Sequence, residues 1–248
     1  MATMEQSELY EAIFKRRSVR KYAGPLDQAT LDEISSFAAS LRPLFPKIRT
    51  EVRVLGGDEV KGPFKVGAPH ILAIYSEAAE GDAANAGFML QQVDLFLSAK
   101  GIGSCWQGGP KPPRGERSVS GLEFVICLAF GRPGEEVHRK SISEFKRKPL
   151  GEITDITGAD ELLEPVRLAP SGMNRQSWFL TGSADAVQVL AARSLVGDRL
   201  GRIDAGIALC HLWLSASRTG KEVDVVVEPP SADRLRRGYV YVATVKRM

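Results

Sequence analysis

Two apolar stretches determine the architecture of this chain: residues 83–100 read AANAGFMLQQVDLFLSAK, and residues 202–217 read RIDAGIALCHLWLSAS. Both are long, and their apolar residues cover most of a helical surface, so we expect two long apolar helices, the first of them central. Ala-Gly follows Asn85 in the first stretch and Asp204 in the second, and both stretches carry Ser-Ala near the end. The two patterns are separated by roughly half the chain, which predicts two pseudo-equivalent halves around an internal two-fold axis.

The segments around these stretches predict a chain that mixes helices and strands. Asp27 is a suitable N-cap for a helix that ends before Pro43. Further helices are expected at residues 5–22, 160–168 and 184–192. Strands are expected at residues 49–55, 68–76, 123–131, 178–181 and 238–246.

The composition is that of a folded globular protein. Of its 248 residues, 44% are hydrophobic and 25% are charged, which excludes disordered, collagen-like and coiled-coil chains. The longest apolar run, Phe124 to Phe130, is far shorter than the roughly 20 residues of a membrane-spanning helix. Residues 1–14 include several glutamates and do not resemble a secretory signal. We therefore expect a cytoplasmic protein without a membrane span.

The cysteines and histidines show no spacing typical of a metal site. The three cysteines form no C-x-x-C pair and are odd in number, and the three histidines are scattered. Neither a disulfide framework nor a bound metal is expected.

Positive charge is concentrated in two clusters, although the net charge is only +3. Residues 16–20 read RRSVR, and residues 146–148 read KRK before a proline. Their guanidinium and hydroxyl groups suit the binding of a phosphate. Alternatively, both clusters are solvated basic faces, the first of which complements a helix dipole. Because only 7% of the residues are aromatic and no groove-reading helix is recognisable, nucleic acid is not an expected partner.

Two further segments are rich in hydrogen-bonding residues or in glycine. Residues 169–178 read APSGMNRQSW, whose hydroxyl and amide groups could pair with the edge of a planar heterocycle; a plain turn is the alternative. Residues 101–109 read GIGSCWQGG, in which the glycines let the backbone approach a ligand closely. Cys105 has no neighbouring histidine or carboxylate in the sequence, so we expect a packed thiol and not a nucleophile.

Together these segments resemble the motifs of the FMN-dependent nitroreductase family. In that family R-R-S-x-R follows the first helix, G-x-G-x-x-W-x-G-G follows the central helix, A-P-S-x-x-N-x-Q-x-W flanks the flavin ring, and R-K-P-L lies near the C-terminus. Here the motifs are residues 16–20, 101–109, 169–178 and 147–150. The resemblance implies an α+β nitroreductase fold with three layers, α/β/α, and FMN as the cofactor.

The resemblance also implies which residues would bind FMN. The phosphate would be held by Arg16, Arg17 and Ser18, together with Arg147 or Lys148. Arg20 would face the pyrimidine end of the ring, where positive charge stabilises reduced flavin. The ring would be flanked, with a backbone N–H near N5, by Trp106, Gln107, Gly108, Gly109, Pro170, Ser171, Gly172, Asn174 and Gln176. No catalytic side chain is expected, because the hydride chemistry belongs to the flavin.

The order of the motifs departs from the usual family pattern. Family members place the ring-flanking loop shortly after R-R-S-x-R and form homodimers with each flavin between two chains. Here the loop lies in the second half, and residues 40–46 retain only a proline at the usual place. The sequence therefore resembles the internally duplicated, single-chain branch, the TM nitroreductase type. Residues 1–150 and 151–248 would mimic the homodimer as one compact unit, expected to be a monomer with one FMN.

For function, the resemblance implies an oxidoreductase that uses NADH or NADPH as electron donor. The donor would reduce FMN and leave, and a nitroaromatic, quinone or similar small-molecule acceptor would then enter the same pocket, in a ping-pong cycle. Three alternatives remain: other flavin chemistry on the same fold, a non-catalytic flavin carrier or sensor, and a basic scaffold for anionic partners.

Overall fold

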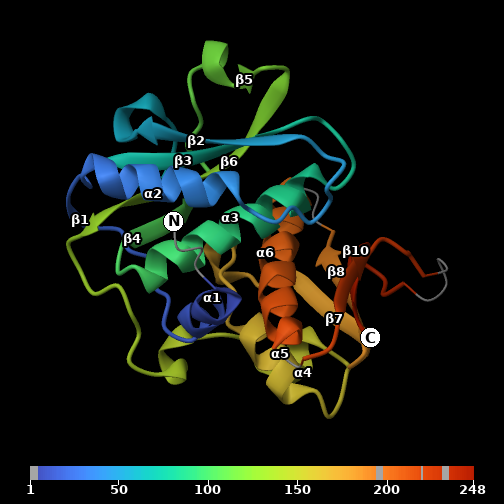
Figure 1. Ribbon diagram of the computed structural model, residues 1–248. Coiled ribbons are helices and arrows are strands. Elements are labelled where there is room, and N and C mark those ends of the chain that lie inside the picture. Colours follow the sequence, from blue (N-terminus) through green and yellow to red (C-terminus); the bar gives the residue numbers. More distant parts are fainter. Residues whose placement is uncertain (1–4, 194–197, 219, 231–234) are drawn as a thin grey trace.

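Two antiparallel sheets form the framework of the chain (Figure 1). The computed structural model describes residues 5–193, 198–218, 220–230 and 235–248. The first sheet has the order β1-β6-β3-β2, and β4 and β5 also pair with β6. Its strands are β1 (Tyr22–Gly24), β2 (Thr50–Gly56), β3 (His70–Ser76), β4 (Gly103–Gln107), β5 (Ser118–Val119) and β6 (Leu122–Pro133).

The second sheet repeats the connectivity of the first. Its order is β7-β8-β10-β9, with the strands β7 (Trp178–Ser183), β8 (Ala186–Ala192), β9 (Val223–Val226) and β10 (Tyr239–Arg247). In the first sheet, β2 pairs with β3, β3 with β6, and β6 with β4. In the second, β7 pairs with β8, β8 with β10, and β10 with β9. A long helix follows the second strand of each series.

These long helices, α3 (Asp82–Ala99) and α6 (Asp198–Ser217), lie at the centre and cross each other (Figure 1). A Cβ atom at Gly87 would lie 2.2 Å from the carbonyl oxygen of Ile203, and one at Gly206 would lie 2.0 Å from that of Ala84. No side chain fits at either position, so the two backbones are in direct contact there. The contact is reciprocal, and it explains why the Ala-Gly pattern occurs in both helices.

The shorter helices surround this crossing. They are α1 (Gln6–Ile13), α2 (Gln28–Ala39), α4 (Leu150–Ile153) and α5 (Asp160–Arg167). As predicted, Asp27 caps α2, because its carboxylate accepts the backbone N–H of Thr30 at 2.9 Å. Helix α1 packs against α3 and α6, and α5 packs against α6.

The first helix is shorter than predicted. It ends at Ile13 and does not continue to Tyr22. The residues that follow are extended: Ser18 forms a parallel bridge with Ser104 of β4, and Arg16 forms an antiparallel bridge with His138. The helix prediction failed because tertiary pairing on both sides of this string outweighs its local helical preference.

The expected helix at residues 184–192 is also wrong, because residues 186–192 form strand β8. Val187, Val189 and Ala191 are buried at alternate positions, as the side chains on one face of a strand must be. The alanines favoured a helix, but the period of two in the burial pattern belongs to a strand between β7 and β10.

The described residues contain neither a membrane-spanning helix nor a cluster of metal ligands. In the part of the chain that the structure describes, no helix is long and apolar enough to cross a membrane. Within the same residues, no three His, Cys, Asp or Glu side chains gather as a metal site would require. Two of the histidines instead contact backbone groups of distant segments: His70 accepts the N–H of Leu26, and His138 lies 2.8 Å from the carbonyl oxygen of Ser98.

Candidate functional site

The basic string at residues 16–20 is held between β4 and the segment that follows β6. The backbone N–H of Val19 donates to the carbonyl oxygen of Ser104 at 2.8 Å. On the other side, the backbone N–H of Arg139 donates to the carbonyl oxygen of Lys15, also at 2.8 Å. The string therefore lies in a fixed, strand-like conformation, which determines where its side chains point.

Arg16 is the buried residue of this string. Its side chain is 1% exposed and forms an ion pair of 3.0 Å with Asp94 of α3. Asp94 also accepts the hydroxyl of Ser104 at 2.6 Å, and Arg16 donates to the hydroxyl oxygen of Ser18 at 3.1 Å. Arg16 is thus a compensated cation that fixes the position of the Ser18 hydroxyl.

A cavity of about 330 Å³ opens beside this string. Three segments that are far apart in the sequence meet around it: the string, the segment before α4, and the loop before β7. The lining residues are Arg16, Arg17, Ser18, Arg20, Arg139, Glu144, Phe145, Lys146, Arg147, Pro170, Ser171, Met173 and Asn174. Basic side chains predominate, so the cavity has the character of an anion site.

Arg147 faces this cavity without a carboxylate partner. It donates to the carbonyl oxygens of Phe145 and Ala169, at 2.8 and 3.0 Å, and to the side-chain oxygen of Asn174 at 2.6 Å. All of these acceptors are neutral. Burial, together with the nearby charges of Arg16 and Arg139, lowers the pKa of Arg147 to about 9.

Arg139 is also held by carbonyl oxygens, although the charge of Glu144, which lines the same cavity, acts to raise its pKa. It donates to the carbonyl oxygens of Arg16 and Glu144, and its guanidinium lies 4.2 Å from the ring centre of Phe145. Burial, together with Arg16 and Arg17, lowers the pKa of Arg139 to about 10. Among the described residues, neither Arg139 nor Arg147 forms an ion pair. A bound dianion would compensate both charges.

Backbone strain is concentrated beside these arginines. Lys146, Met173, Asn174 and Gln176 have φ angles of 47°, 51°, 56° and 51°, in the left-handed region that non-glycine residues rarely adopt. Such residues cost on the order of 1–3 kcal/mol each, and they cluster at binding and active sites. Lys148 contributes to holding them, because its backbone N–H donates to the side-chain oxygen of Gln176 at 2.7 Å.

A buried carboxylate on α6 holds the loop at residues 169–178. Asp204 of α6 accepts the backbone N–H of Gly172 at 3.0 Å. At the matching position of α3, Asn85 accepts the backbone N–H groups of Leu44 and Phe45, at 2.8 and 3.0 Å. The polar residue that precedes Ala-Gly therefore holds a loop in both parts of the chain.

The turn at residues 106–109 lies outside the basic cavity, at the far end of β4. The indole N–H of Trp106 donates to the side-chain oxygen of Gln91 at 3.2 Å. Gln107 accepts the backbone N–H of Val66 at 2.9 Å. A Cβ atom at Gly109 would lie 2.4 Å from the carbonyl oxygen of Pro63, so the backbone of this turn is closely covered by the loop between β2 and β3.

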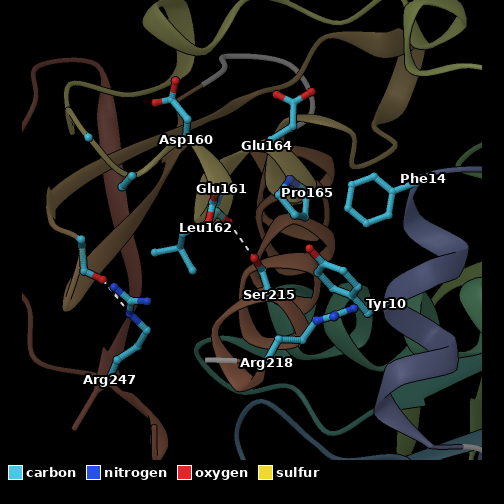
Figure 2. A pocket seen from close by; sticks show the side chains of 13 residues that line it. Tyr10, Phe14, Asp160, Glu161, Leu162, Glu164, Pro165, Ser215, Arg218 and Arg247 are labelled. Atoms are coloured by element: carbon cyan, nitrogen blue, oxygen red, sulfur yellow. Dashed lines mark hydrogen bonds between the residues drawn. The ribbon is translucent and has the colours of Figure 1, made fainter. Parts of the chain in front are cut away.

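A larger cavity, of about 920 Å³, lies elsewhere, beside α1, α5 and α6 (Figure 2). Tyr10 and Phe14 line it together with Pro165, and Arg218 lies over the ring of Tyr10 at 4.5 Å. Arg218 already has an ion-pair partner in Glu11, at 2.8 Å. None of the residues that the motifs single out lines this cavity, so size alone does not identify the functional site.

The structure brings most of the residues that the motifs single out into one place. Those that line the basic cavity are Arg16, Arg17, Ser18, Arg20, Arg147, Pro170, Ser171 and Asn174. Gly172 and Gln176 belong to the same loop: Gly172 donates to Asp204 of α6, and Gln176 bonds to Ser171 within the loop and accepts the backbone N–H of Lys148. Trp106, Gln107, Gly108 and Gly109 stay outside it. Cys105 is 4% exposed, and burial raises the pKa of its thiol, as expected for a packed thiol.

Sequence reasoning missed two residues of the site. Arg139 has no motif around it and is recruited only by tertiary pairing with the string. Asp94 was treated as part of an apolar helix. A lone carboxylate within an apolar helix face was the available signal, since a buried charge requires a partner.

Known proteins resemble this chain both in sequence and in structure. The family described as "Putative TM nitroreductase" matches residues 8–216. A structure from Thermotoga maritima, titled as a putative nitroreductase, has a TM-score of 0.66 and 20% identity, and the match covers 100% of this chain and 94% of that chain. A structure titled as an FMN-dependent nitroreductase from Clostridium difficile R20291 has a TM-score of 0.42 and 18% identity, with 55% and 92% covered. No curated protein matches the sequence. The Thermotoga likeness shows a nitroreductase fold.

Proposed function

Since the chain belongs to the TM nitroreductase family, whose sequence model matches residues 8–216, we propose that this nitroreductase-family oxidoreductase uses FMN. The observation that carries the proposal is the pair of arginines, Arg139 and Arg147, which face the basic cavity and form no ion pair with any carboxylate of the described residues. Their charges fit a phosphate dianion, which accepts several charge-assisted hydrogen bonds at once.

The residues around the cavity divide the expected tasks. The phosphate would be held by Arg147, Arg139, Arg17 and the Ser18 hydroxyl, while Arg16 orients Ser18 from its ion pair with Asp94. Lys148 fixes the side chain of Gln176 through its backbone N–H. These groups would anchor one end of the cofactor and leave the other end free to react.

The ring would lie between the loop at residues 169–178 and the turn at residues 106–109. Arg20 would face its pyrimidine end. Bound FMN would supply the redox chemistry, accepting a hydride from NADH or NADPH and passing electrons to a nitroaromatic, quinone or similar acceptor. The protein's own tasks are then to bind, orient and shield the reacting partners. Donor and acceptor would occupy the same pocket in turn, and this predicts ping-pong kinetics.

We further propose one flavin per chain and a monomeric protein. The repeated sheet connectivity and the reciprocal helix crossing support two pseudo-equivalent halves, residues 1–150 and 151–248. Of the two loops held by Asn85 and Asp204, the second borders the basic cavity described above. At the first, the ring of Phe45 lies so close to Gly81 that a Cβ atom there would be 2.5 Å from it. An aromatic side chain thus fills the space beside the first loop.

The visible spectrum of the purified protein, followed by heat release and quantitation of the chromophore, is the direct test. About one FMN per chain is expected, and turnover of NADH or NADPH with a quinone acceptor should follow. A colourless protein that also fails to bind added FMN would contradict the proposal. Bound flavin without turnover would instead point to a carrier or sensor, and a ratio near two would exclude the single site.

Arg139→Gln tests the basis of the proposal. It removes one charge from the cavity, and the loss of a charge-assisted hydrogen bond should weaken FMN binding about 10- to 100-fold. Arg53→Ala is the matched control, because Arg53 lies on β2, pairs with Glu51 and does not line the cavity. Equal FMN affinity in wild type and Arg139→Gln would argue against a phosphate at this position.

A further inference from the structure

A chain of buried hydrogen bonds runs from the turn at Trp106 across both central helices. The indole N–H of Trp106 donates to the side-chain oxygen of Gln91 on α3, at 3.2 Å. The side-chain nitrogen of Gln91 lies 3.0 Å from Nε2 of His211 on α6. Nδ1 of His211 lies 2.8 Å from the carbonyl oxygen of Pro165 on α5. Gln91 and His211 are both completely buried.

Every proton in this chain of contacts has only one possible position. The carbonyl of Pro165 can only accept, so Nδ1 of His211 carries the proton and Nε2 is the acceptor. The Gln91 amide group therefore donates to His211, which leaves its oxygen for Trp106. Burial lowers the pKa of His211 to about 3, so the ring stays neutral and the direction is the same at any working pH.

The end of α5 makes the last acceptor available. In a regular helix the carbonyl of Pro165 would accept the backbone N–H of Ala169, but that N–H donates to Val166 instead, at 3.1 Å. The carbonyl of Pro165 is therefore available to accept from His211. Directly after this helix end, Arg147 donates to the carbonyl oxygens of Leu168 and Ala169. We call the contacts from Trp106 through Gln91 and His211 to Pro165 the relay. The relay therefore ends in the last turn of α5, which leads into the loop at residues 169–178.

The relay thus links the two segments between which we place the flavin ring. One end is Trp106, in the turn at residues 106–109, and the other is the helix end that leads into the loop at residues 169–178. The contact between Gln91 and His211 lies close to the crossing at Gly87 and Gly206, where the helix backbones touch. The relay is therefore attached to a fixed point in the molecule.

We propose that Gln91 and His211 are positioning residues, which hold Trp106 at a fixed separation from the loop at residues 169–178 and thereby set the reduction potential and affinity of the bound flavin. The proposal rests on the proposed function, because it concerns the same site. Neither residue lines the basic cavity. They act only through Trp106 and through the end of α5.

A double-mutant cycle measures this action. Gln91→Met removes the relay amide with little change in volume, and Trp106→Phe removes the indole donor at its half-buried end. Each is expected to shift the midpoint potential of bound FMN and to raise its Kd about five- to ten-fold, the value of roughly one hydrogen bond. In the Trp106→Phe background, Gln91→Met should add much less than it does in the wild type.

Gln92→Leu is the matched control. Gln92 is the next residue of α3 and is 4% exposed, and its side chain bonds to the backbone of Phe88 and Arg42 and, within the described part of the chain, to no residue of the relay. Gln92→Leu removes a buried amide from α3 but leaves the relay intact. The midpoint potential of bound FMN should therefore stay at the wild-type value. A potential unchanged in Gln91→Met, or effects that add fully with those of Trp106→Phe, would overturn the proposal.

A measurement on the protein without flavin separates this proposal from the proposed function. The indole N–H resonance of Trp106, identified by its loss in Trp106→Phe, should shift and exchange faster with solvent in Gln91→Met. If the resonance responds but wild type binds no FMN, the relay exists and the proposed function is wrong. If the resonance responds, FMN binds and its potential stays unchanged, the relay is structural only and the positioning role is wrong.

Discussion

The buried side chain of Asp204 accepts a hydrogen bond from Gly172, in the loop at residues 169–178. Burial raises its pKa to about 7, while the hydrogen bond from Gly172 opposes that rise. In the unfolded chain the same group has an ordinary pKa of 3.8. From about pH 4 to about pH 7 the folded chain therefore retains a proton that the unfolded chain has released. Its contribution to the free energy of unfolding falls as the pH rises through this window.

Asp204→Asn should remove this pH dependence. The amide oxygen can still accept the N–H of Gly172, and no charge is buried at high pH. We expect the variant to match wild type near pH 4 and to exceed it above about pH 7, by at most about 4 kcal/mol for a shift of about three pKa units. Urea unfolding across this range measures the difference. The control variant is Asp160→Asn, which alters an exposed aspartate. If the free energy of unfolding of Asp204→Asn changed with pH as it does in the wild type, Asp204 would not be the source of the pH dependence.

Because Arg139 and Arg147 face the basic cavity, we expect phosphate to stabilise the folded protein. Inorganic phosphate should raise the Tm of the protein at constant ionic strength, because an anion that binds only the folded chain stabilises it. Phosphate at 100 times its Kd would add about 2.7 kcal/mol, which corresponds to several degrees for a chain of this size. Chloride at equal ionic strength is the control. In Arg139→Gln the phosphate effect should be much smaller, and equal Tm gains in both proteins would exclude these arginines.

Sequence motifs identify a residue of the candidate site only where its neighbours in the sequence form a recognisable pattern. Arg147 and Asn174 could be singled out because their neighbours form recognisable strings, and the structure joins them by a 2.6 Å hydrogen bond. Arg139 could not, because its partners lie far away in the sequence, and for Asp94 the sequence offers only its isolation as a carboxylate within an apolar helix. Gln91 and His211 belong to the same class, since nothing local distinguishes a relay glutamine from a core residue.

The crossing of α3 and α6 makes a prediction about whole elements. Alanine has the higher helix propensity by about 1 kcal/mol, yet Gly87→Ala and Gly206→Ala should both destabilise the protein. The added methyl would lie 2.2 or 2.0 Å from a carbonyl oxygen of the other helix, so the helices must separate. We expect losses of about 1–3 kcal/mol or more in urea unfolding, as for other overpacked sites.

Gly151→Ala is the control for this pair. Gly151 lies in α4, and a Cβ atom there would have nothing within 4 Å. The substitution should be neutral or slightly stabilising. If Gly87→Ala and Gly206→Ala behaved in the same way, the direct backbone contact at the crossing would be wrong.

Helices and strands whose pattern of apolar residues agrees with their burial were predicted well, such as α3 and β3. The errors at α1 and β8 share one cause, because in both cases pairing with a distant strand outweighed local preference. Strand β4 was expected only as a glycine-rich turn, although Gly103–Gln107 pairs with β6 along its length. Its short run shows no alternation to detect, since most of its residues are buried on both faces.

For the whole molecule, the two central helices predict a single unfolding transition. Residues 83–98 of α3 and residues 203–216 of α6 are buried without interruption. Neither helix has a face that could be left to solvent, so residues 1–150 or 151–248 alone should fail to fold cooperatively. Circular dichroism and tryptophan fluorescence should report coincident urea transitions for the full chain. Two separate transitions, or a stable fragment, would show that the halves are independent domains.

The Ala-Gly pattern predicts two related halves, but it gives no indication that the strand order of the first sheet recurs in the second. That order, β2-β3-β6-β4 and β7-β8-β10-β9, became visible only in space. Strand pairing depends on contacts between distant residues, for which a single sequence carries no direct signal.

Residues 134–177 connect the last strand of the first sheet to the first strand of the second, and the part before α4 supplies Arg139, Phe145 and Arg147 to the basic cavity. A passive tether tolerates insertion, cleavage and sequence drift, but this connection contributes side chains to a cavity. Opening the chain before α4 by circular permutation would therefore disrupt the basic cavity even if both sheets still assembled. Because the chain passes from the first sheet to the second once, this connection can border only one of the two loops that Asn85 and Asp204 hold.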